Sequence, residues 1–277
     1  QFSVLMSVYK NDNPLHFTQA VLSVINQTIA PSEIIIVIDG PVGEELQAAI
    51  DQIAKDYSII KLVSLSTNMG LGLALQEGSK HCSYDLIARM DSDDISLPDR
   101  FEKQLKIFQE NQELDVVGSN MSEFIDEPSN IVSIRSLPQF HDDICKFLKK
   151  RSPLNHVTVM MKKSSLIKAG GYLDWKNMED YYLWIRMFLS GAKFYNIQEN
   201  LVNVRIDDNL FKRRAGLRYF KNLAKLQKFM LKNKIISYPR YVINVFIRFG
   251  QILAPNWLRK LVYKNVVREK VQNNNKD

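Results

Sequence analysis

Three aspartates crowd together directly after the strand-length apolar segment from Leu86 to Met90. They are Asp91, Asp93 and Asp94, in the sequence Asp-Ser-Asp-Asp. Three carboxylates in so short a stretch at the end of a buried strand repel one another unless a cation lies among them. Carboxylate oxygens suit Mg²⁺ or Mn²⁺, which leave room for water and for substrate phosphate oxygens. The pattern favours a divalent metal and a nucleotide diphosphate, although an acidic loop or a helix cap also fits so short a motif.

A second acidic pair, Glu179-Asp180, lies in the first turn of a helix predicted from Asn177 to Met187. Carboxylates at a helix N-terminus are stabilised by the helix dipole, so ordinary capping is the competing interpretation. Carboxylates at such a place can also act as general bases.

The composition sets limits on what the chain is. With 277 residues, of which 45% are hydrophobic, it can bury a substantial core. The two cysteines, Cys82 and Cys145, have neither a disulfide pattern nor a zinc-binding pattern around them, so we expect a reducing cytoplasm. There is no signal-peptide pattern and no apolar run of about 18 residues, so we expect no spanning helix.

Strands and helices alternate along the first 110 residues. The predicted strands are 2–9, 33–39, 61–66 and 86–90, and the predicted helices are 16–27, 44–57, about 70–80 and 98–110. This alternation predicts an α/β fold with a doubly wound, mostly parallel sheet and flanking helices. Ligands bind such sheets at the carboxyl ends of the strands, where Tyr9, Asp39, Asn68 and Asp91 all fall.

The second part of the chain mixes shorter elements. Strands are predicted at 115–125, 131–134, 157–161, 192–197 and 201–206, and helices at 140–150 and 177–187. We therefore expect a domain over 1–210, with a nucleotide-binding half at about 1–112 and an acceptor half at about 113–210. A basic extension follows over 211–277.

These motifs, in this order, resemble the family 2 glycosyltransferases of the GT-A fold. The resemblance rests on Ser7-Val8-Tyr9, on Asp39 closing the second strand, on Asn68-x-Gly70, on Asp91 to Asp94, and on Glu179-Asp180, and it covers roughly residues 2–206. Within the family the chain is most similar to bacterial enzymes that build O-antigen or exopolysaccharide repeats, including the amylovoran type.

The resemblance implies roles for the donor side. Asp39 accepts a hydrogen bond from uracil with Tyr9 near the base, although Asp39-Gly40 is equally typical of a turn. Asn68 and Gly70 border the nucleotide, although a helix N-cap fits them as well. The remaining donor and metal residues are Asp91 at the ribose or the metal's water shell, Ser92 beside it, Asp93 as metal ligand, Asp94 toward the donor sugar, and Arg205 near the diphosphate. Arg89 is expected to be a charge partner of the acids.

It also implies an acceptor side. A sugar hydroxyl is a poor nucleophile, so direct displacement at the anomeric carbon requires a carboxylate base and inverts that centre. We assign the base to Asp180, with Glu179 sharing the role or orienting the acceptor. His156, at a predicted strand start, is either close to the active site or structural. Trp184 stacks on a sugar ring or belongs to the core.

The metal site is incomplete in this sequence. Many relatives carry a histidine ligand shortly after the strand predicted at 201–206, and this chain has Ile206-Asp207-Asp208 there. A third protein ligand is therefore left open. The basic cluster Lys212-Arg213-Arg214 follows, where it is able to meet a diphosphate.

The extension is strongly basic. Residues 211–277 contain 17 Lys and Arg against 2 Asp and Glu, whereas the whole chain has a net charge of +7. Tyr219, Leu223, Leu226, Phe229 and Met230 form one helical face, Lys221, Lys225, Lys228 and Lys232 the opposite one, and Trp257, Leu258, Leu261 and Val262 recur at helical spacing. Such helices suit an anionic membrane surface. The alternative is a helical subdomain packed on the core with a solvated basic face.

Together these features predict an inverting, metal-dependent transferase. It would move Glc or Gal from a UDP-sugar to an N-acetylhexosamine on a polyprenyl diphosphate, in a β1,3 linkage, during O-antigen or exopolysaccharide synthesis. We expect it on the inner face of the bacterial cytoplasmic membrane. A nucleotidyltransferase is the first rival, but no Gly-rich basic loop follows the first strand. A nucleic-acid-binding protein is the second, but residues 1–210 carry an excess of acids.

Overall fold

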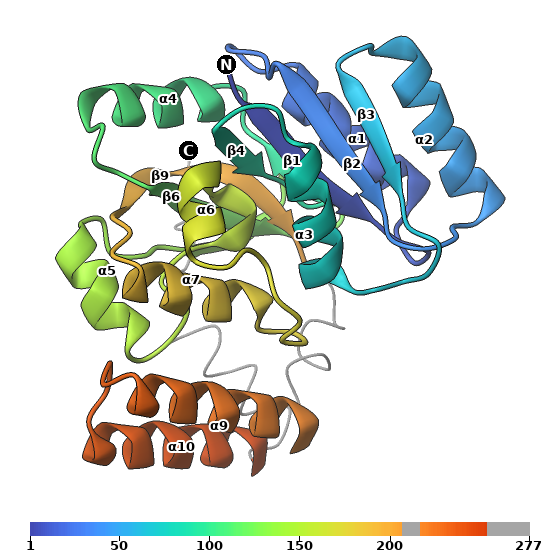
Figure 1. The fold of residues 1–277 in the computed structure, drawn as a ribbon. Coiled ribbons are helices and arrows are strands. Elements are labelled where there is room, and N and C mark those ends of the chain that lie inside the picture. Colours follow the sequence, from blue (N-terminus) through green and yellow to red (C-terminus); the bar gives the residue numbers. More distant parts are fainter. Residues whose placement is uncertain (207–216, 254–277) are drawn as a thin grey trace, which may run out of the picture.

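β-Branched residues form the middle of the sheet. In β2 (Glu33–Ile38), every residue is buried, as expected for a parallel strand covered on both faces. β2 pairs in parallel with β1 (Ser3–Val8) and β3 (Ile60–Ser64), and β1 pairs in parallel with β4 (Leu86–Arg89). The computed structural model describes residues 1–206 and 217–253, and Figure 1 shows their arrangement. The parallel half predicted from the sequence is confirmed.

Helices connect these strands and cover both faces. α1 (Pro14–Ile25) and α2 (Glu44–Asp56) cover one face, and α3 (Leu71–His81) covers the other. The side chain of Asn13 caps α1 by accepting hydrogen bonds from the backbone of Leu15 and His16. α4 (Arg100–Glu110) begins two residues after Pro98, where the predicted helix began.

The second half of the sheet is mixed rather than parallel. Within the described residues the strand order is β3-β2-β1-β4-β8-β6-β9-β5, with β7 on β6. The bounds are β5 (Ile95–Ser96), β6 (Val116–Phe124), β7 (Ile131–Arg135), β8 (Met160–Lys162) and β9 (Phe194–Arg205). β6 and β9 are parallel, whereas β4 and β6 each run antiparallel to β8.

Several predicted elements are corrected here. The two strands predicted at 192–197 and 201–206 form one long strand, β9, which bends through register shifts against β6. β5 was not predicted, and neither was α6 (Lys163–Lys168). α5 spans His141–Leu148 and α7 spans Glu179–Leu189. His156 begins a short 3-10 helix, His156–Thr158, rather than a strand.

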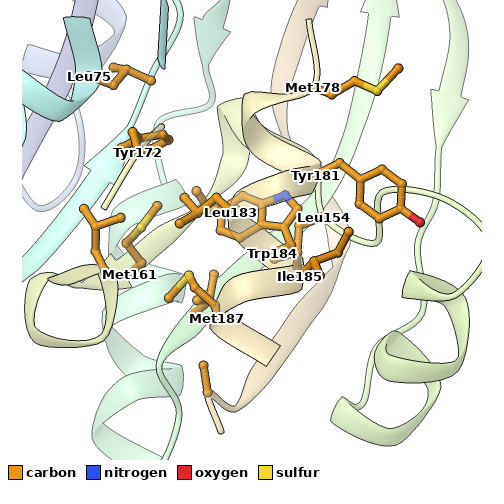
Figure 2. Close-up of a cluster of buried hydrophobic side chains, with 14 of the residues drawn as sticks. Leu75, Leu154, Met161, Tyr172, Met178, Tyr181, Leu183, Trp184, Ile185 and Met187 are labelled. Atoms are coloured by element: carbon orange, nitrogen blue, oxygen red, sulfur yellow. The ribbon is translucent and has the colours of Figure 1, made fainter. Parts of the chain in front are cut away.

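Alternating strand residues supply two hydrophobic cores, one on each face. Leu5, Ile35 and Val37 face the core that α3, α5 and α7 complete, and Val4 and Ile36 face the core of α1, α2 and α4. Figure 2 shows the first core, with Leu75, Leu154, Met161, Tyr172, Met178, Tyr181, Leu183, Trp184, Ile185 and Met187 packed together. The helix that carries Glu179 and Asp180 is therefore anchored along its length.

The basic extension forms a helical hairpin of α9 (Leu217–Lys232) and α10 (Tyr238–Leu253), seen at the bottom of Figure 1. The apolar face predicted for α9 exists, but it packs on the sheet-containing part of the chain, residues 1–206. Leu226 and Met230 are fully buried, and the ring of Phe229 packs edge-on against Tyr182 of α7. This face is therefore not available to a membrane. The structure agrees here with the alternative of a helical subdomain packed on the core.

Two predictions of the sequence fall outside the described residues. They are the basic cluster Lys212-Arg213-Arg214 and the apolar repeat that begins at Trp257. Within the described ranges, no helix is long and apolar enough to cross a membrane.

The contacts of the hairpin with the core contribute to stability. Leu226→Ala removes a fully buried side chain, so we expect a loss of roughly 2 to 4 kcal/mol in the free energy of unfolding. Urea-induced unfolding measures this loss. Lys225→Ala, at the exposed neighbouring position, is the control and should change the free energy by less than about 0.5 kcal/mol. Equal values for both variants would mean that α9 does not pack on the core.

Candidate active site

Asp39 organises the loop that precedes α3. Its carboxylate accepts hydrogen bonds from the backbone N–H of Met69 (2.6 Å) and Gly70 (2.9 Å) and from the side-chain amide of Asn68 (3.0 Å). The next residue, Gly40, has a φ of +82°, and a methyl group there would lie 2.5 Å from the Asn68 nitrogen. Only glycine permits this approach. The ends of β2 and β3 thus form one rigid unit.

Asn68 does not cap α3, because its amide is bound to Asp39 and the N-cap position is Gly70. Gly70 has a φ of +86°, which lets the chain turn into the helix while its N–H still reaches Asp39. The predicted positions of Asp39, Asn68 and Gly70 at one edge of the sheet are therefore correct. Their contact with a nucleotide remains a prediction.

Asp12 was not identified from the sequence. It lies in the turn after β1, and its carboxylate accepts hydrogen bonds from the Ser92 hydroxyl (2.7 Å) and the Tyr9 backbone N–H (3.1 Å). Burial, with a further contribution from the charge of Asp91, raises the pKa of Asp12 to about 6. Asp12 thus joins the first turn to the Asp-Ser-Asp-Asp segment. The local sequence Asn11-Asp12-Asn13-Pro14 is typical of a turn and does not reveal this contact, because the partner of the Asp12 carboxylate lies 80 residues away.

Asp91 forms an ion pair with the buried guanidinium of Arg89, the charge partner expected from the sequence. Asp94 is also buried, and it accepts a hydrogen bond from the backbone N–H of Arg205 (2.8 Å). Burial, followed by the charges of Asp93 and Asp91, raises the pKa of Asp94 well above its usual range. The segment therefore concentrates negative charge in a small volume.

Arg205 holds this segment against the end of β9. Its guanidinium donates to the carbonyl oxygens of Asp93 (3.2 Å) and Asp126 (2.7 Å) and to the side chain of Gln19 (3.1 Å). The same group lies over the ring of Phe124, 4.6 Å from its centroid. Arg205 therefore lies beside the acids, and its contact with the diphosphate stays a prediction.

The donor set of this segment fits a hard divalent cation. Asp91 and Asp93 are half-buried carboxylates, and oxygen ligands suit Mg²⁺ or Mn²⁺. In the described part of the chain, no group of three or more His, Cys, Asp or Glu side chains is arranged to hold a metal. Two carboxylates are enough for an ion whose remaining ligands are waters and phosphate oxygens.

Glu179 and Asp180 begin α7 directly beside the first turn of α3. A methyl group at Gly72 would lie 3.2 Å from the Glu179 Cβ and 2.9 Å from the Leu173 carbonyl oxygen. Burial and the charge of Asp180 raise the pKa of Glu179 to about 7. Asp180 accepts a hydrogen bond from the Ser152 hydroxyl (3.3 Å).

Arg89 links the two acidic groups. Its charge pairs with Asp91 and also acts on Glu179, where it opposes the rise in pKa. The two segments, far apart in sequence, therefore lie within electrostatic range of the same guanidinium. Its Nε and Nη1 atoms are buried and have no hydrogen-bond partner among the described residues.

Trp184 and His156, the other residues considered for the acceptor side, pack against each other. Trp184 is completely buried in the core of Figure 2, so of its two alternatives the structure supports the core residue and not stacking on a sugar ring. The ring of His156 packs edge-on against Trp184, and its Nε2 lies 2.9 Å from the Tyr172 hydroxyl. Burial and the charge of Arg89 lower the pKa of His156 well below its usual range, so this imidazole is neutral. Helical periodicity alone could not tell which face of α7 is covered.

The model of glycosyl transferase family 2 matches residues 3–170 of this chain. A UDP-Gal:alpha-D-GlcNAc-diphosphoundecaprenol beta-1,3-galactosyltransferase of Escherichia coli is 38% identical over 97% of this chain and 97% of its own. The chain belongs to glycosyltransferase family 2. An amylovoran biosynthesis glycosyltransferase of Erwinia amylovora is 34% identical, over 95% of this chain and 98% of its own. The predicted family and enzyme class are confirmed, and neither rival function is favoured.

Solved structures agree on the fold of this family 2 enzyme. The TarS fragment 1–349 of S. aureus, in complex with UDP-GlcNAc, superimposes with a TM-score of 0.64 at 16% identity, over 83% of this chain and 66% of that one. A mannosyltransferase of Pyrobaculum calidifontis, in complex with GDP-Man and Mn²⁺, gives a TM-score of 0.62 at 11% identity, over 94% of this chain and 77% of that one. The predicted GT-A fold is confirmed.

The raised pKa of Glu179 has a consequence for stability. Between its ordinary value of about 4.5 and its folded value of about 7, the folded state keeps a proton that the unfolded state loses, so stability falls as the pH rises. Glu179→Gln has no titrating carboxyl group at this position and therefore does not show this loss. In the absence of metal, we expect its free energy of unfolding, relative to that of the wild type, to rise by about 2 kcal/mol from pH 5 to pH 8.

Urea-induced unfolding at both pH values measures this difference. The exposed Glu45→Gln on α2 serves as the control and should follow the wild type at both. If the difference in the free energy of unfolding between Glu179→Gln and wild type were the same at both pH values, Glu179 would not titrate in this range.

Proposed function

We propose that this enzyme moves a hexose from a UDP-sugar to a polyprenyl-diphosphate-linked N-acetylhexosamine, with inversion of the anomeric centre. Galactose and a β1,3 linkage to GlcNAc are the favoured pair. The support is the 38% identity, over nearly the full length of both chains, to the Escherichia coli enzyme whose name states that donor and acceptor. Such an acceptor belongs to O-antigen or exopolysaccharide assembly on the inner face of the cytoplasmic membrane.

One observation supports the chemistry most directly. Asp91, expected on the donor side, pairs with the buried guanidinium of Arg89, and Glu179, expected on the acceptor side, lies within electrostatic range of it. A transferase that works by direct displacement needs both sets at one site, because the base and the departing diphosphate lie on opposite sides of the anomeric carbon.

On the acceptor side, a carboxylate accepts the proton of the attacking hydroxyl. Asp180 is our choice for this base, because Ser152 orients its carboxylate and the residue lies at the solvent-accessible start of α7. Glu179, with its pKa of about 7, shares or relays the proton near neutral pH. One displacement by the activated oxygen inverts the anomeric centre.

On the donor side, the loop held by Asp39 and the turn at Tyr9 receive the uridine. Asp39 keeps acceptor capacity for the uracil imide, since a carboxylate has about four lone-pair sites and three donors reach it here. Asp93, with Asp91, would hold the divalent ion, and Asp94 and Arg205 support that segment. When bound, Mn²⁺ or Mg²⁺ neutralises the charge that develops on the diphosphate.

A donor screen tests this function. The protein is incubated with Mn²⁺, a synthetic GlcNAc-diphospholipid, and UDP-Gal, UDP-Glc or UDP-GlcNAc in turn, and the product linkage is determined by NMR. We expect a β1,3-linked hexose, with UDP-Gal as the best donor. Transfer only from a different class of nucleotide sugar, or retention of the donor's configuration, would contradict the proposal.

The base assignment predicts a selective loss. Asp180→Asn keeps the size of the side chain and removes its basicity, so kcat should fall by about 10² to 10⁴ with little change in the donor KM. Steady-state kinetics with the preferred donor measure both values. Asp174→Asn, an exposed acid in the preceding loop, is the matched control and should keep wild-type kcat. Normal turnover by Asp180→Asn would move the role to Glu179.

The metal assignment predicts a thermal shift. A ligand that binds only the folded state raises Tm, so saturating Mn²⁺ with UDP should raise it by several degrees. Asp93→Ala should abolish the increment that depends on Mn²⁺. Asp51→Ala, an exposed acid on α2, should keep it. An unchanged increment in Asp93→Ala, measured by calorimetry, would exclude Asp93 as a ligand.

A further inference from the structure

α10 presents large apolar side chains to solvent. Ile243, Phe246 and Ile247 are 49%, 71% and 55% exposed, and Phe249 is 42% exposed. Ile243, Phe246 and Ile247 follow helical spacing, so they lie on one side of the helix. The buried Asn244 lies on the other side, where its amide donates to the Lys149 carbonyl (2.9 Å). The apolar side therefore faces away from the catalytic part of the chain.

α9 presents positive charge in the same way. Leu226 and Met230 bury its inner side, and the lysines of its opposite side are all exposed; they are Lys221, Lys225, Lys228 and Lys232. Residues 217–253 contain eight Lys and Arg and no Asp or Glu. The lysines of α9 and the apolar side chains of α10 both lie opposite the sides that pack on the rest of the chain, so they belong to the outer surface of the hairpin. We call Ile243, Phe246, Ile247 and these four lysines the hairpin outer surface.

We propose that the hairpin outer surface docks on an anionic lipid bilayer, with the apolar side chains of α10 inserted and the lysines of α9 at the headgroups. This combination is the one that holds amphipathic helices in the plane of a membrane. Lysine stems accompany the apolar side chains inward while the ammonium groups stay with the phosphates. Both helices have an apolar face, and the structure buries that of α9 and leaves that of α10 exposed.

Charge argues against a second copy of this chain as the occupant. In a two-fold dimer the same patch meets itself, so the lysines of the two copies would lie close together. With no acid in residues 217–253 to offset them, they repel. An anionic lipid bilayer can bind both the lysines and the apolar side chains of the hairpin outer surface.

Docking on this surface also positions the candidate base. The segment after α5 contacts the hairpin through Lys149 and Lys150, whose carbonyl oxygens accept from Asn244 and Arg248. The same segment continues to Ser152, which donates to Asp180. The acceptor side of the site is thus attached to the surface that meets the membrane. This step rests on the proposed lipid-linked acceptor, whereas the binding itself does not.

Vesicle flotation with the full chain tests the binding. The wild type should float with vesicles of phosphatidylglycerol and phosphatidylcholine, and less with phosphatidylcholine alone or at high salt. Phe246→Glu/Ile247→Glu should lower the bound fraction by at least about tenfold. The matched control is Ile167→Glu on α6, whose side chain is 64% exposed, and it should bind as the wild type does. Circular dichroism verifies that each variant is folded.

The outcomes separate the two proposals. A folded double variant that binds anionic vesicles like wild type overturns the docking surface, as does a wild type that does not float. A wild-type dimer in light scattering that the double variant disrupts also overturns it, in favour of self-association. Activity is then compared with a short, water-soluble acceptor, on which the double variant should match wild type. If wild type floats but transfers to no acceptor, docking stands and the proposed reaction fails.

Discussion

The candidate site depends on a buried positive charge, the guanidinium of Arg89. Arg89 is 2% exposed and pairs with Asp91, and its charge acts on Glu179 of α7. A buried guanidinium is costly without a partner, and Asp91, whose side chain is 37% exposed, supplies the ion pair. Arg89 therefore anchors the acidic segment that follows β4. Its charge also reaches Glu179, so the acids predicted for the donor side and for the acceptor side share one electrostatic environment.

The negative charge of the candidate site exceeds the single positive charge of this arginine. Asp12, Asp94 and Glu179 all have raised pKa values, which for Asp12 and Glu179 are about 6 and 7. The largest cause in each case is burial, and a neighbouring carboxylate adds to it. Carboxyl groups that hold protons near neutral pH are poised either to accept a cation or to exchange a proton. The first property suits the Asp-Ser-Asp-Asp segment, and the second suits α7.

Sequence reasoning succeeded where one local pattern determines the structure. The β-branched run of β2 and the acids directly after β4 required no knowledge of distant contacts. It failed where contacts between segments far apart in the sequence determine the role of a residue. Asp12 matters because Ser92 reaches it, and Trp184 is covered by elements that its own helix does not specify. Likewise the hydrophobic pattern of α9 is that of any amphipathic helix, and only the packing of Leu226 on the core shows which surface remains for a partner.

In the proposed reaction, one UDP-sugar donor lies between the two acidic segments, Asp91 to Asp94 and Glu179-Asp180. A crystal structure with UDP and Mn²⁺ measures this directly. The account predicts the ion on the Asp93 carboxylate, the uracil beside the loop held by Asp39, and the carboxylates of Glu179 and Asp180 facing the diphosphate across a gap of sugar size. A nucleotide bound elsewhere, or an ion that avoids Asp93, would contradict it.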